Sequence, residues 1–262
     1  MEAERARRVL RQFLETDLLL GVAETPLRRS EAVLPAATAT SEPTARPGPA
    51  RPAPAATPPT PPPAAAPSGH APDLGEGTAR ERFARLPAAL AADPTLAGRL
   101  GGQPPALGAG ALPARVVFVG EAPGPDGDAE EAQKLLDGMV KAMKLSDAEV
   151  FRCPCLPFEP ASGGHPSPAD LAAGAGALKA QLLLAAPELV VAMGGAAAKA
   201  LLGTTVGITR LRGTWASCAW TDPPVPVMPT LSPAFVLRSY TKHNRTMVWE
   251  DLQEVMKRLG EA

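Results

Sequence analysis

Short apolar runs alternate with helical segments along the C-terminal part of the chain, and this alternation limits the fold more than any other feature. The runs at 115–120 and 188–194 have the continuous apolar character of strands that are buried on both faces. The other elements that we predict are strands at 149–153 and 225–228 and helices at 78–92, 129–144, 169–186, 196–202 and 246–259. This order is typical of a mainly parallel sheet with helices on both faces, and ligands bind such sheets beyond the carboxyl ends of the strands.

Two of these helices carry specific local signals. Ser167 followed by Pro168 is a typical cap and first-turn pair, so we expect the helix at 169–186 to begin there. Pro87 lies inside the helix at 78–92, where its missing N–H and its ring predict a kink or a break.

The N-terminal part of the chain is predicted to lie outside this domain. Twelve of the 32 prolines fall between positions 35 and 67, and such a segment buries too little apolar surface to offset its conformational entropy. We therefore expect an amphipathic helix in 1–22 (residues 2–21), a disordered Pro/Ala-rich linker at 23–72 and one domain at 73–262. A single short helix is marginal alone, so we expect it to dock on another protein or on the C-terminal domain.

Charge and composition exclude several classes of protein. A net charge of −1 argues against nucleic-acid binding by the chain as a whole, although local basic patches remain compatible with it. No apolar run approaches the roughly 20 residues that span a bilayer. Three cysteines form no disulfide framework, and with no secretory signal they indicate a cytoplasmic protein. With only three histidines as well, we expect no metal site and no cofactor.

Five strings lie in the loops after the predicted strands and in the closing helix. They are G-E-A-P-G at 120–124, G-G-A-A-A-K-A-L-L-G at 194–203, V-G-I-T-R-L-R-G at 206–213, P-T-L-S-P-A-F-V-L-R at 229–238 and V-W-E-D-L at 248–252. In this order and at this spacing, the chain resembles the uracil-DNA glycosylase superfamily over about 115–259, closest to its iron–sulfur (family 4) branch. The resemblance implies a three-layer α/β/α sandwich with a four-stranded, mainly parallel sheet and a base-binding cleft at the strand ends. The residues expected to shape this pocket are Gly120, Ala122, Pro123, Gly124, Pro154, Phe158 and Gly194.

Three residues are candidates for catalysis. Glu121 stands where the branch places the acid that positions the attacking water; the alternative is that it only binds backbone amides of its own turn. Ser232 stands where the branch has the histidine that stabilises the leaving uracil anion, and a hydroxyl supplies only one neutral hydrogen bond. His243 is the one histidine near the predicted DNA surface and is a candidate to replace that histidine; the alternative is an ordinary exposed side chain.

Other positions depart from the pattern of the branch. The stacking phenylalanine has no counterpart in 126–133, and the asparagine that reads uracil is replaced by Pro154, which has neither an amide side chain nor an N–H. Phe158 and, approximately, Gly174 replace two cluster cysteines, and the upstream C-x-x-C is absent, so we expect no iron–sulfur cluster. Cys153 and Cys155 are interpreted as buried strand residues. The string H-P-S-P at 165–168 resembles a catalytic loop of some relatives, but we interpret it as a helix entry.

A basic segment follows these departures. Between 199 and 245 there is one acid, Asp222, against six cations, namely Lys199, Arg210, Arg212, Arg238, Lys242 and Arg245. All but Lys199 are assigned to DNA binding, together with the apolar tip of Pro233, Ala234 and Phe235, which resembles the family's minor-groove wedge. The alternative is a solvated charged face with Phe235 in the core.

Two functions remain from these comparisons. We expect a DNA-associated protein of the base-excision-repair type whose glycosylase activity is weak, altered or lost, with the fold kept as a binding module. The alternative is an active DNA glycosylase with a remodelled site that hydrolyses the N-glycosidic bond of a damaged base.

Overall fold

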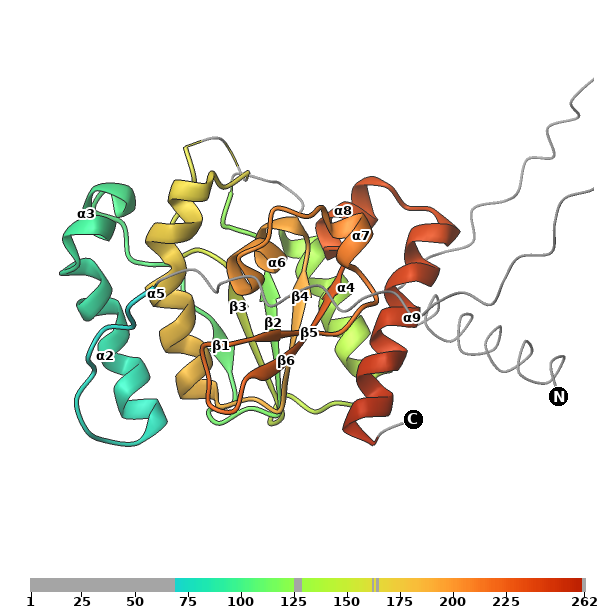
Figure 1. The fold of residues 1–262 in the computed structure, drawn as a ribbon, viewed down its shortest axis with the longest axis horizontal. Helices are drawn as coiled ribbons and strands as arrows, with labels where there is room; N and C mark the ends of the chain where they lie inside the picture. Colours follow the sequence, from blue (N-terminus) through green and yellow to red (C-terminus); the bar gives the residue numbers. More distant parts are fainter. Residues whose placement is uncertain (1–68, 125–128, 162, 164, 261–262) are drawn as a thin grey trace, which may run out of the picture.

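A computed structural model describes residues 69–124, 129–161, 163 and 165–260 (Figure 1). The helix predicted at 2–21 and most of the predicted linker, 23–68, lie outside the described residues. Within the described part of the chain, no helix is long and apolar enough to cross a membrane.

Six strands form one sheet in the described residues, in the order β1-β3-β2-β4-β6-β5. Their bounds are β1 (Ala109–Gly110), β2 (Val116–Gly120), β3 (Val150–Pro154), β4 (Leu189–Met193), β5 (Ala216–Cys218) and β6 (Val225–Thr230). The four central strands are parallel, as predicted, whereas β1 and β5 pair antiparallel at the two edges. The prediction of four strands was therefore too low by two, because edge strands of two and three residues carry no apolar run.

Helices cover both faces of this sheet, which confirms the α/β/α sandwich. They are α2 (Ala79–Ala91), α3 (Pro94–Leu100), α4 (Ala129–Ala142), α5 (Pro168–Ala185), α6 (Gly195–Leu202), α7 (Ile208–Leu211), α8 (Pro233–Arg238) and α9 (Lys242–Leu259). Alternate residues of β2 enter two cores: Val117 and Val119 pack with α5 and α6, and Val116 and Phe118 pack with α4 and α9. Figure 1 shows α2 and α3 stacked outside α5.

Helix starts follow their capping residues. Ser167 caps α5 and Pro168 occupies its first turn, which confirms the predicted start. The last helix begins four residues earlier than predicted, because the Thr241 side chain accepts a hydrogen bond from the Asn244 N–H at 3.1 Å. The predicted break at Pro87 is absent: α2 continues through it, since Leu86 and Leu90 on either side are fully buried in the core.

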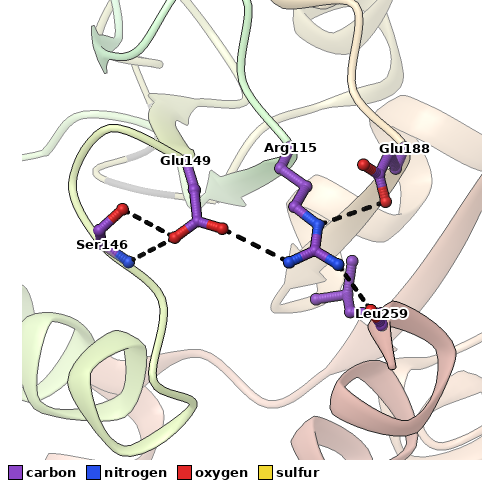
Figure 2. A network of polar contacts seen from close by, with 5 residues as sticks. All are labelled: Arg115, Ser146, Glu149, Glu188 and Leu259. Atoms are coloured by element: carbon purple, nitrogen blue, oxygen red, sulfur yellow. Dashed lines mark hydrogen bonds and ion pairs between the residues drawn. The ribbon is translucent and has the colours of Figure 1, made fainter. Parts of the chain in front are cut away.

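The amino ends of the central strands are tied together by Arg115 (Figure 2). Its guanidinium lies 3.4 Å from Glu149, which precedes β3, and 3.4 Å from Glu188, which precedes β4. It also donates to the carbonyl of Leu259, the last residue of α9, at 2.5 Å. This polar network lies at the end of the sheet opposite to the loops predicted to carry function.

Candidate functional site

A cleft of about 1180 Å³ opens at the carboxyl end of the sheet. Its walls come from the ends of β2, β3 and β4, from the turn after β6, and from α4 and β1. The location agrees with the rule that open parallel sheets bind ligands beyond the carboxyl ends of their strands. Figure 1 shows α7 and α8 beside this end of the sheet.

Glu121 follows β2 directly and lines the cleft. Its half-buried side chain lies over Gly194, so that a Cβ at position 194 would be 2.8 Å from Glu121 Oε1 and 3.0 Å from Cγ. Gly194 also has a φ of +97°, a conformation that favours glycine. No hydrogen bond or ion pair joins the Glu121 carboxylate to another described residue.

Ser232 reaches the same cleft from the turn after β6. It is buried and caps α8, since its Oγ accepts a hydrogen bond from the Phe235 N–H at 3.2 Å. The hydroxyl hydrogen can still donate into the cleft. Two residues before Ser232, the Thr230 carbonyl accepts a hydrogen bond from the Gly194 N–H at 2.9 Å. Because Gly194 contacts the Glu121 side chain, this bond fixes the turn of Ser232 relative to Glu121.

The turn that carries Ser232 is held in place by an ion pair with a buried carboxylate, that of Asp251. Arg212 donates to Asp251 from Nη2 at 2.6 Å and from Nε at 3.1 Å, and Thr230 Oγ1 donates to the same carboxylate at 2.6 Å. Burial raises the pKa of the Asp251 carboxyl, and the hydrogen bond from Thr230 and the charge of Arg212 act against that rise. Neither Thr230 nor Asp251 was among the predicted site residues, although both lie in the strings at 229–238 and 248–252.

Two comparisons with known proteins identify the family of the chain. The family model described as the Uracil DNA glycosylase superfamily matches residues 107–255. The chain belongs to this superfamily. It is also 30% identical over 155 residues to the type-4 uracil-DNA glycosylase of Thermotoga maritima, which covers 56% of this chain and 79% of that protein.

The superfamily fold brings together two of the three residues predicted for catalysis. Glu121 and Ser232 both line the cleft, but His243 is exposed on the first turn of α9 and is absent from the described cleft walls. The pocket residues divide in the same way. Gly120, Ala122, Pro123, Gly124 and Pro154 line the cleft.

Phe158 and Gly194 have other positions. Phe158 is buried in the core beneath the Arg99 guanidinium, 5.4 Å from the ring centre, so it does not face the cleft. Gly194 contacts the Glu121 side chain instead of lining the cleft itself.

The predicted DNA-binding residues have different environments. Arg210, Arg238 and Lys242 are exposed, and Arg245 stacks on Tyr240 at 4.7 Å. Arg212 instead belongs to the buried pair with Asp251.

The apolar tip is divided as well. Pro233 and Ala234 line the cleft, although Pro233 is buried at the start of α8. Phe235 is 39% exposed, so the alternative that placed it in the core does not hold.

The side of the cleft formed by α4 and β3 carries two acids. Asp137 and Asp147 lie on its walls and both face the Arg152 guanidinium, at 3.4 and 3.1 Å. Lys141 of α4 lines this side as well, so its two acids are matched by two cations, Lys141 and Arg152. The exposed basic residues lie near α7, α8 and the start of α9.

The residues present do not fit the iron–sulfur cluster of the branch. Such clusters are held by four cysteine thiolates, and the chain has three cysteines. Burial raises the pKa of Cys153 to about 12, which opposes the thiolate that a metal requires. Among the described residues, no group of three or more His, Cys, Asp or Glu side chains lies close enough to hold a metal ion.

Proposed function

We propose that the chain is a DNA-associated protein of the base-excision-repair type that engages DNA at the cleft and removes uracil slowly or not at all. Membership of the superfamily and the name of the Thermotoga relative, a uracil-DNA glycosylase, support the DNA-repair part of the proposal. The observation that carries the second part is that Ser232, at the turn after β6, offers the cleft only the single neutral hydrogen bond of its hydroxyl group.

The chemistry explains why this matters. Hydrolysis breaks the bond between sugar C1′ and the base nitrogen, leaves the electron pair on the base, and adds a water oxygen to C1′ as that water loses a proton. A carboxylate near the sugar helps with the water and with the positive charge, and Glu121 is suited to this task. The departing anion needs a strong donor, and the loss of such a donor typically lowers the rate by about 10²–10³-fold.

The walls of the cleft also offer little to hold uracil. Pro154 ends β3 opposite Gly120 and supplies neither an amide side chain nor an N–H. Phe118 is the one aromatic residue along the described walls, and it is 1% exposed within β2, so no ring is open for stacking on a flipped base. Both features support a weak or altered preference for uracil.

Exposed cations beside the cleft support DNA binding. Arg210, Arg238 and Lys242 are exposed, and phosphate contacts by such cations give affinity without sequence preference. The exposed ring of Phe235 is suited to insertion between bases.

The alternative, an active glycosylase for another damaged base, is favoured by one observation. The Glu121 carboxylate is in the cleft and has no described partner, which is the state expected of a group that acts on water or on the sugar.

One assay separates the two functions. The full chain would be incubated with single- and double-stranded DNA containing uracil, hypoxanthine or xanthine, and alkali-labile sites and binding would both be measured. We expect binding with little or no cleavage, and we expect weaker binding when Arg238 and Lys242 are changed to Ala, with Arg80→Ala on α2 as the matched control. Efficient cleavage that Glu121→Gln abolishes, and that Glu159→Gln leaves intact, would establish the alternative instead.

A further inference from the structure

The contact between α3 and the start of α5 is held by three side chains, Arg99, Phe158 and Asp170, which we call the α3–α5 clasp. Arg99, in the last turn of α3, forms an ion pair with Asp170 in the first turn of α5 and lies over the Phe158 ring. Asp170 also completes the capping box of α5 through Ser167. Hydrogen bonds from Ser167, followed by the charge of Arg99, hold the pKa of the Asp170 carboxyl below its usual value.

Leu156 packs against α5 at Gly174, four residues along the helix from Asp170. This side chain is 1% exposed, and a Cβ added at Gly174 would overlap with Leu156 Cδ2 and lie 3.2 Å from Pro157 Cδ. A cysteine at position 174 therefore fits only if the Leu156 side chain shifts. Phe158 and Gly174 are also the two positions at which the resemblance to the iron–sulfur branch expects cluster cysteines.

The three cysteines that the chain does have cannot assemble elsewhere. Cys153 and Cys155 lie at the end of β3, whereas Cys218 lies in β5. The order of the strands places β3 and β5 about 19 Å apart. An iron–sulfur cluster is only a few ångströms across, so one cluster cannot draw on both strands.

We propose that the α3–α5 clasp and Leu156 replace the iron–sulfur cluster of the branch, so that this domain folds and keeps its cleft without iron. The position of Leu156 connects this region to the cleft. It lies two residues after Pro154, and between them the Cys155 N–H donates to the Gly120 carbonyl at 3.1 Å. Packing around Leu156 thus anchors the loop that follows Pro154. Close packing of side chains is enough for this anchoring, and no metal is required.

Iron content gives the first test. The full chain would be produced in iron-supplied cells and purified without oxygen, and its iron, its acid-labile sulfide and its visible absorption would be measured. Thermal unfolding would then be compared before and after treatment with a chelator. We expect no visible absorption band and no shift of the midpoint. Stoichiometric iron and sulfide, or a lower midpoint after chelation, would overturn the proposal.

Substitutions in the packed volume give the second test. Leu156→Ala should lower the thermal midpoint by about 4–20 °C, whereas Leu183→Ala, at an exposed position of α5, should leave it nearly unchanged. Gly174→Ala should also lower the thermal midpoint. The variant that combines Leu156→Ala with Gly174→Ala should lose less than the sum of the two single losses, because Leu156→Ala makes room for the new methyl group. Leu156→Val would replace Leu156→Ala if the latter does not fold. Additive losses, or a Leu156 variant as stable as Leu183→Ala, would contradict the proposal.

Discussion

Arg212 donates two hydrogen bonds to the buried carboxylate of Asp251, at 2.6 and 3.1 Å, and so links the α7 region to α9. A third hydrogen bond to this carboxylate comes from Thr230, and the Thr230 carbonyl in turn accepts from Gly194. One polar network therefore connects the closing helix with both sides of the cleft.

Removal of the Arg212 guanidinium from this network should destabilise the folded protein. Arg212→Ala leaves the Asp251 carboxylate buried without its partner, and we expect it to lower the free energy of unfolding by about 3–5 kcal/mol. Urea denaturation followed by circular dichroism would measure the loss. Arg210→Ala, at an exposed position of α7, is the matched control and should change it by less than about 0.5 kcal/mol. Equal stabilities of the two variants would contradict a structural role for the pair.

The same network predicts a specific pH dependence. Burial raises the pKa of Asp251 in the folded protein above its unfolded value, so its contribution to stability is present below the unfolded pKa and is lost as the pH rises through the folded pKa. Asp251→Asn removes this titration. The stability of the wild type relative to Asp251→Asn should therefore fall as the pH rises above the ordinary pKa of an aspartate, as measured by denaturation at each pH. A constant difference between the two proteins would show that Asp251 does not titrate in this way.

Gly194 is predicted to control the position of Glu121. Gly194→Ala introduces a methyl group 2.8 Å from Glu121 Oε1 at a φ of +97°, so we expect a loss of about 1–3 kcal/mol in stability and a displaced carboxylate. Thermal unfolding and a crystal structure of the variant would measure these two effects. Gly195→Ala, on the first turn of α6, meets nothing within 4 Å and should be neutral or stabilising. A stable Gly194→Ala variant with Glu121 unmoved would exclude this role.

Ser232 should contribute to stability through its hydroxyl oxygen. Ser232→Ala removes the cap of α8 and is expected to cost about 0.5–2 kcal/mol. Ser232→Thr keeps the hydroxyl and should retain most of that stability. Chemical denaturation of both variants tests the cap, and equal losses in the two would indicate that packing in the cleft dominates at this position.

The central strands and several helix starts could be predicted from the sequence because their causes are local. The apolar runs of β2 and β4 identify buried strands, and Ser167 with Pro168 marks the start of α5. The edge strands and α8 were missed for the opposite reason. β1 consists of two exposed residues, and these form a strand only because the fold brings them next to β3. α8 is short and depends on its cap at Ser232.

The sequence by itself determined the superfamily, the four central strands and the place of Glu121 in the loop after the first of them, because each follows from short strings and their spacing. Only the tertiary structure decided which of the predicted residues meet. Glu121 and Ser232, 111 positions apart, share one cleft, whereas His243 points to solvent on another helix. Arg212 likewise changed from a predicted DNA contact to the partner of the buried Asp251 carboxylate, 39 positions away. Burial of a charge depends on which elements pack around it, and no local pattern in the chain encodes that packing.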